Sequence, residues 1–160
     1  MTTNNEHFDP CEEIQEERPA EGLHVLQVMA MTVTRSKSRA RWLMNVLDAR
    51  TIRNPAGDLA VGGSLREWYV PGSGRVAKLK LRGLLGAVDP KLLTTSPADG
   101  GYNWQDQASV TDHLVGRLFL AKVYHEPDKW TDSEGEERVG VNVRIDLDSY
   151  ASLSKKDRAA

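Results

Sequence analysis

The sequence predicts a mostly β domain in which five strands are interrupted by one helix between the third and the fourth strand. Two observations predict this order. Short segments rich in β-branched and aromatic residues recur along the chain, separated by Gly, Pro and Asn. Apolar residues recur at helical spacing between the third and the fourth of these segments. The length of 160 residues fits a single domain.

Three strands are expected before the helix. Residues 23–34 are rich in β-formers, and no helix-capping residue precedes them. Residues 41–49 follow a polar basic loop and alternate between two faces. Asn-Pro and Gly-Asp turn residues at 54–58 separate this strand from a short aromatic-rich segment at 64–70, which we expect to be the third strand.

The expected helix covers residues 75–87. Prolines and glycines break the chain just before it, and Ser73 is available as its N-terminal cap. Residues 89–112 contain two prolines and two glycines with little periodicity, so a long loop is expected there. Tyr102 and Trp104 are expected to fix this loop to the domain.

The last two strands form an expected hairpin. Residues 115–124 are the first of them, residues 126–137 form a charged turn, and residues 139–147 are apolar at every second position. Five antiparallel strands with a helix between the third and the fourth are the arrangement of an OB-fold barrel, which is the predicted fold. An open α+β sheet with the same element order is the alternative.

Composition sets the expected limits of the domain. Residues 6–21 carry seven acidic residues and one arginine, with few apolar residues to support folding. We therefore expect a disordered acidic tail at 1–20, the OB-fold domain at 21–150 and a flexible C-terminal tail at 151–160.

Charge is segregated along the chain, although the net charge is only −2. Residues 35–82 carry eleven bases against three acids, a formal charge of +8, whereas residues 89–148 carry six bases against twelve acids. The first region can attract phosphate, so a binding face is expected on one side only. The sequence has no long apolar run and no secretory leader, and its one cysteine, Cys11, cannot form an internal disulfide. These features predict a cytoplasmic protein without a membrane segment.

The loop before the second strand is the main candidate for a binding site. It places four cations within seven residues and ends on an aromatic side chain: Arg35, Lys37, Arg39, Arg41 and Trp42. Cations neutralise phosphates and aromatic rings stack on bases, which is the composition that single-strand binding requires. In an OB fold this loop borders the binding groove. The alternative is a solvated basic loop with Trp42 in the core.

The third strand supplies the remaining candidates. Trp68 and Tyr69 are neighbours on a strand, so they face opposite sides and one of them points away from the core. The sequence does not distinguish which one. Arg66 shares a face with Trp68, and both are assigned to the nucleic-acid-binding site. On the predicted helix three cations share one flank, which is expected to be a solvated face: Arg75, Lys78 and Arg82.

Motifs that suggest catalysis or cofactor binding have simpler interpretations. Residues 72–77 match G-x-G-x-x-A, but a dinucleotide fingerprint requires an early parallel βαβ unit, and three antiparallel-looking strands precede this match. The acidic stretch 128–137 lacks the spacing of a calcium loop and is interpreted as a solvated hairpin. The histidines are far apart, and no nucleophile motif occurs. We expect no enzyme activity, no cofactor and no metal.

Several short features across residues 21–150 point to one family. They are Glu21-Gly22, Ser36-Lys37, Gly62-Gly63, Leu84-Leu85, Leu114-Val115-Gly116-Arg117, and Gly135 followed by Asn142 and Tyr150. Through them the chain resembles a family of phage-encoded OB-fold proteins that look like single-stranded DNA-binding proteins. The resemblance implies a role in a phage replication or recombination module, in the host cytoplasm, with proteins of that module as further partners. The chain departs from many cellular single-strand binders because its C-terminus has no acidic tip.

Two functions from different classes remain open. The first is a non-sequence-specific single-stranded DNA-binding protein, with the loop cations on phosphates and Trp42 or Trp68 stacked on a base. The second is an OB-fold protein-interaction module without nucleic-acid binding. A nuclease that uses the acidic stretch is a third, weaker hypothesis. The sequence leaves open whether DNA or RNA is bound and is compatible with self-association.

Overall fold

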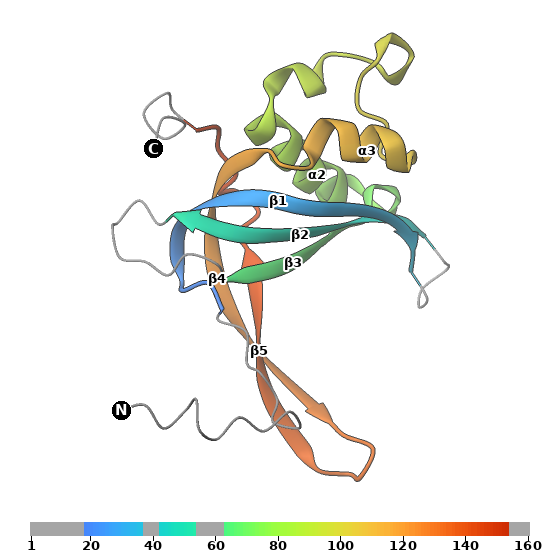
Figure 1. Cartoon of the computed structure of the whole chain (residues 1–160). Coiled ribbons are helices and arrows are strands. Elements are labelled where there is room, and N and C mark those ends of the chain that lie inside the picture. Colours follow the sequence, from blue (N-terminus) through green and yellow to red (C-terminus); the bar gives the residue numbers. More distant parts are fainter. Residues whose placement is uncertain (1–17, 37–41, 54–62, 154–160) are drawn as a thin grey trace, which may run out of the picture.

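The computed structural model describes residues 18–36, 42–53 and 63–153. Five strands form one antiparallel sheet in the order β3-β2-β1-β4-β5 (Figure 1). Their bounds are Gly22–Arg35 for β1, Leu43–Arg53 for β2, Ser64–Tyr69 for β3, Leu118–Thr131 for β4 and Glu137–Ile145 for β5. Helix α2, Arg75–Val88, lies between β3 and β4. The predicted mostly β class and the predicted element order are therefore confirmed.

The predicted closure into a barrel is wrong. Among the described strands β3 pairs only with β2, and β5 pairs only with β4, so both remain edge strands. The strand β3 has six residues, and most of β5 pairs with the distal part of β4, away from β3. The two edges approach each other where β5 ends, and side chains join them there.

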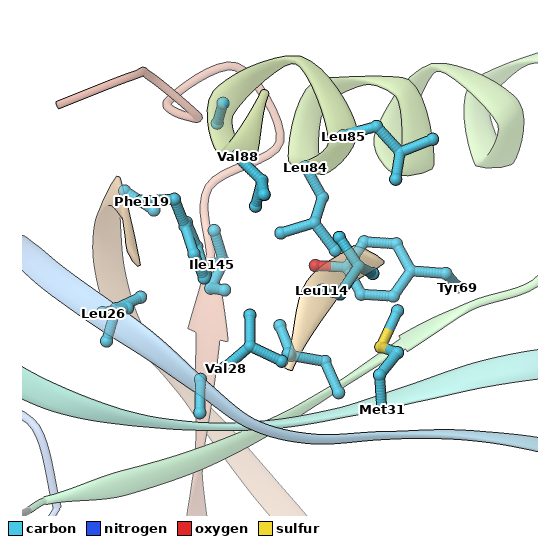
Figure 2. Close-up of a cluster of buried hydrophobic side chains, with 14 of the residues drawn as sticks. Leu26, Val28, Met31, Tyr69, Leu84, Leu85, Val88, Leu114, Phe119 and Ile145 are labelled. Carbon is cyan, nitrogen blue, oxygen red and sulfur yellow. The ribbon is translucent and has the colours of Figure 1, made fainter. Parts of the chain in front are cut away.

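The hydrophobic core of the described residues lies between the sheet and the helices (Figures 1 and 2). It includes Leu26, Val28 and Met31 from β1, Tyr69 from β3, Leu84, Leu85 and Val88 from α2, Leu114 from α3, Phe119 from β4 and Ile145 from β5. The apolar spacing that predicted α2 is the face that the helix buries.

The N-terminus of α2 differs from the predicted cap. Gly74, not Ser73, is the residue before the helix, and its φ of 143° is a conformation that favours glycine. Residues Pro71–Ser73 form a short 3-10 helix, and the Ser73 hydroxyl donates to the Val70 carbonyl at 2.8 Å. The serine therefore closes the turn that precedes the helix.

The predicted long loop at 89–112 contains a second helix at its end. Helix α3, Gln107–Leu114, begins after Asp106, whose side chain accepts a hydrogen bond from the Ala108 backbone N–H at 3.2 Å. The Gln107 side chain fixes α3 to β1, because it donates to the Met31 carbonyl at 2.8 Å. The rest of the segment contains two short 3-10 helices, Pro90–Leu93 and Pro97–Asp99.

The last two strands extend beyond the body of the domain as a hairpin arm (Figure 1). We define the arm as residues 126–142. Residues 126–131 were predicted to belong to a turn, but they continue β4, and the turn is confined to residues 132–136. Asp132 builds this turn, because its carboxylate accepts from the backbone N–H groups of Glu134 and Glu136 and from Arg138 Nε, at 2.9 to 3.0 Å.

The N-terminal end of the described chain contacts β4. Pro19 is buried, and its carbonyl oxygen lies 2.7 Å from His125 Nε2. Most of the two tails expected from composition lies outside the described residues, as do 37–41 and 54–62. Where the structure is described, no helix combines the length and the apolar character needed to cross a membrane.

Candidate nucleic-acid interface

The alternation of β3 decides which of its aromatic side chains faces solvent. Leu65, Glu67 and Tyr69 are buried on the inner face. Trp68 lies on the outer face and is 44% exposed, whereas Tyr69 is fully buried. The strand therefore presents Trp68 outward together with Arg66, as their shared parity predicts.

An apolar surface surrounds Trp68 on the outer face of β2 and β3. Val46 lies directly opposite Trp68, and Met44 precedes Val46 by two residues on β2 and lies on the same face. Trp42, which immediately precedes β2, is 41% exposed. We call Trp42, Met44, Val46 and Trp68 the outer aromatic face. The sequence prediction missed Met44 and Val46, although their parity with Trp42 is a signal that could have found them.

The two exposed tryptophans are separated along the sheet. Val46 is the cross-strand partner of Trp68 and lies four residues beyond Trp42 along the extended chain. The Cα atoms of Trp42 and Val46 are therefore about 14 Å apart. This separation is too long for both rings to stack on one base. Beside Trp42 lies a shallow pocket of about 140 Å³, lined by Ser36, Trp42, Met44, Val70 and Ser73.

Arg66 is exposed but carries its own counterion. Its Nε donates to Asp48 Oδ1 at 2.8 Å across the β2–β3 pair. This hydrogen bond and the charge of Asp48 raise the pKa of Arg66. Asp48 was not part of the predicted site. It cancels the formal charge of Arg66, so the surface around Trp68 is less basic than the sequence prediction assumed.

The basic loop begins and ends beside the outer aromatic face. Arg35 is the exposed last residue of β1, and the Ser36 backbone N–H donates to the Trp42 carbonyl at 2.9 Å. The three other predicted cations, Lys37, Arg39 and Arg41, lie outside the described residues. They belong to a segment of five residues whose two flanking residues, Ser36 and Trp42, are hydrogen-bonded to each other.

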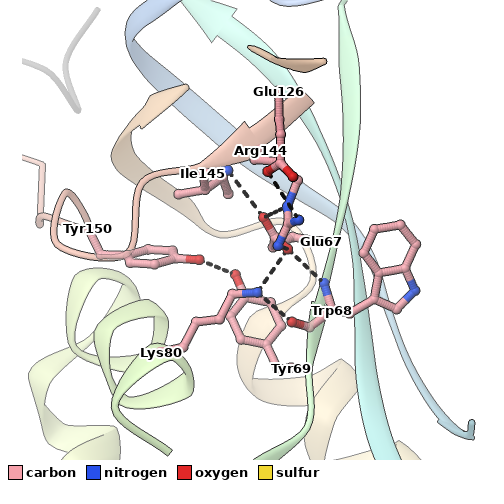
Figure 3. A network of polar contacts seen from close by, with 8 residues as sticks. All are labelled: Glu67, Trp68, Tyr69, Lys80, Glu126, Arg144, Ile145 and Tyr150. Carbon is pink, nitrogen blue, oxygen red and sulfur yellow. Dashed lines mark hydrogen bonds and ion pairs between the residues drawn. The ribbon is translucent and has the colours of Figure 1, made fainter. Parts of the chain in front are cut away.

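A buried carboxylate, Glu67, joins the two edges of the sheet (Figure 3). Lys80 Nζ of α2 donates to its Oε1 at 2.8 Å, and Arg144 Nη2 of β5 lies 3.1 Å from the same oxygen. The Ile145 backbone N–H donates to Oε2 at 3.1 Å. We call Glu67, Lys80 and Arg144 the edge clasp. The sequence prediction missed the edge clasp, although the alternation along β3 places Glu67 on the face opposite to that of Trp68.

Two opposing effects set the ionisation of Glu67. Burial raises the pKa of its carboxyl group, but hydrogen bonds from Arg144 and Lys80 outweigh burial and hold the pKa below its ordinary value. The Tyr69 hydroxyl, also buried, is hydrogen-bonded to the Tyr150 hydroxyl. Burial raises the pKa of both phenols. These groups are paired inside the protein and face away from the outer aromatic face (Figure 3).

The described residues hold no cluster of three or more His, Cys, Asp or Glu side chains that could bind a metal ion. Residues 72–77, which match the dinucleotide pattern, follow an antiparallel sheet and include the first turn of α2. Comparison of the chain with protein-family models and with curated proteins finds no match.

Proposed function

We propose that the protein binds single-stranded DNA without sequence preference on the outer aromatic face. One observation carries the proposal: Trp42 and Trp68 are both exposed on the same face of the sheet, at the end where the basic loop begins and ends. Every base has an aromatic face, so stacking on tryptophan tolerates any sequence. The loop cations then supply contacts to phosphates.

The arrangement of the strands supports this proposal. Five antiparallel strands, with a helix between β3 and β4 and with edges that meet without backbone pairing, are compatible with a partly open sheet of the OB type. In OB folds the face of the second and third strands binds oligonucleotides. The resemblance to phage single-strand binders extends the proposal to a replication or recombination module.

Alanine substitutions test the outer aromatic face. Stacking of one base on an aromatic ring contributes about 1–3 kcal/mol, so Trp42→Ala and Trp68→Ala should each weaken binding roughly 5- to 150-fold. The assay is fluorescence anisotropy of a labelled oligo-dT of about 15 nucleotides. Trp130→Ala is the matched control, because Trp130 is equally exposed but lies on the arm. Equal losses in all three variants would contradict a site at the outer aromatic face.

The salt dependence of binding tests the basic loop. If Arg35, Lys37, Arg39 and Arg41 each contact a phosphate, together they contribute about −3 to the slope of log affinity against log salt. Replacing all four with alanine should flatten the slope by that amount. A wild-type protein that binds no oligo-dT at low salt would favour the protein-interaction alternative. Incubation of the labelled oligonucleotide with Mg²⁺ tests the nuclease hypothesis, and we expect it to stay intact.

A further inference from the structure

The arm exposes apolar side chains that would normally face a core. Val139 is 68% exposed and Val141 is 37% exposed, whereas Ile145, on the same face of β5, is buried. Trp130, on the opposite face of the arm, is 49% exposed and covers Gly140. Val139 and Val141 form an exposed apolar stripe on one face of the arm, and neighbouring exposed apolar side chains mark an interaction surface.

Acidic side chains surround these apolar residues. Residues 126–138 carry six acids against two bases, a formal charge of −4. In the turn at the tip, Glu134 and Glu136 are exposed. The arm therefore disfavours phosphate and suits a partner surface that is both apolar and positively charged.

A surface of that kind lies on the same protein, where α2 begins. A cavity of about 510 Å³ separates the first turn of α2 from the proximal part of β4 and β5. Its lining includes the exposed apolar residues Val76 and Leu147, and the cations Arg75, Lys80 and Arg144. We call this cavity the socket.

The socket carries a positive charge in spite of the edge clasp. Lys80 and Arg144 are balanced by two carboxylates, because both contact Glu67 and Arg144 Nη1 also lies 3.7 Å from Glu126 Oε2, so the positive charge comes from the start of α2. Arg75 and Lys78 are exposed on the first turn of α2. The N-terminus of a helix adds partial positive charge at the same place.

The distal part of the arm cannot reach the socket of its own chain. Trp130 lies six residues beyond Tyr124, a socket residue on the same strand, which is about 20 Å of extended chain. The arm also points away from α2 (Figure 1). We propose that the arm of one copy docks in the socket of a second copy, so that the protein self-associates head to tail. An interface of this type joins different surfaces of the two copies and can continue from copy to copy.

Charge reversal on each side of the contact tests the proposal in the absence of DNA. The arm variant is Glu134→Lys/Glu137→Lys, and the socket variant is Arg75→Glu/Lys78→Glu. Glutamate is favourable in the first turn of a helix, so the socket variant should fold. Sedimentation velocity at low salt should show wild-type species larger than one chain, and each variant alone should sediment as a single chain.

Mixing the two variants distinguishes a head-to-tail contact from any other. The reversed arm of one variant then matches the reversed socket of the other, so an equimolar mixture should regain the large species. Lys91→Glu/Arg117→Glu is the matched control, since both residues are exposed away from the arm and the socket, and it should associate like the wild type. Val139→Thr/Val141→Thr keeps the strand but removes the apolar stripe, and it should reduce association. A wild type that remains a single chain, or a mixture that does not associate, would overturn the proposal.

Discussion

Replacing Glu67 with glutamine should destabilise the protein at neutral pH. The substitution keeps the size of the side chain and removes the charge that Lys80 and Arg144 contact at 2.8 and 3.1 Å. Removing one partner of a buried ion pair costs about 3–5 kcal/mol. The Arg144 side chain is 32% exposed, so water compensates part of its loss. We therefore expect a loss near the lower end, about 3 kcal/mol, which lowers the Tm by roughly 10 °C.

The effect of Glu67→Gln should disappear in acid. The pKa of Glu67 in the folded protein is below its ordinary value of 4.5. A carboxylate of this kind stabilises the fold above the unfolded pKa, and its contribution is lost as the pH falls through the folded pKa. Urea unfolding of the wild type and of Glu67→Gln should give free energies of unfolding that differ at neutral pH and converge below pH 4.5. Equal free energies at neutral pH, or a difference that persists in strong acid, would refute the role of the edge clasp.

Two further substitutions probe the loop before α3. Asn45→Ala should cost about 1–3 kcal/mol, because buried Asn45 donates to the Trp104 carbonyl and accepts from the Tyr102 hydroxyl, both at 2.8 Å. Chemical denaturation measures the loss, and unchanged stability with an unchanged near-ultraviolet dichroism spectrum would contradict this anchor. Gly101→Ala should cost about 3 kcal/mol, since its Cβ would overlap the Thr95 carbonyl oxygen. Gly72→Ala, whose Cβ meets nothing within 4 Å, is the control and should change the unfolding free energy by less than about 0.5 kcal/mol.

The alternation along β3 predicted that Trp68 and Tyr69 lie on opposite faces, but it did not predict which face is buried. Trp68 and Tyr69 are both large aromatic residues, so local sequence gives no reason to bury one of them. The choice depends on Tyr150, eighty-one positions beyond Tyr69, whose hydroxyl pairs with that of Tyr69. Glu67 is buried for a similar reason, because its partners come from α2 and β5. Contacts between distant parts of the chain therefore decide which side chains of β3 are exposed. The alternation along the strand gives only the two possible choices.

The prediction missed α3 and misjudged the arm for different reasons. Helix α3 has eight residues, too few for a periodic pattern to stand out, although capping by Asp106 and burial of Val110 and Leu114 follow the usual spacing. The charged residues 126–131 suggested a turn because charges are rare in strands that pack on a core. In the arm they extend into solvent, where a strand can carry them. The alternation in β5 predicted an extended strand but not that its first half lies outside the core.

The edge clasp also protects the open sheet from unwanted pairing. An unpaired edge strand offers its backbone N–H and C=O groups to any extended chain, which is a route to aggregation. On β3 the Trp68 N–H donates to Glu67 Oε1, and the Trp68 carbonyl accepts from Lys80 Nζ at 2.6 Å. On β5 the Ile145 N–H is occupied by the same carboxylate. Two side chains thus occupy three of the backbone groups that an incoming strand would need. A sheet that stops short of a barrel can in this way resist the addition of a strand at the place where its edges meet.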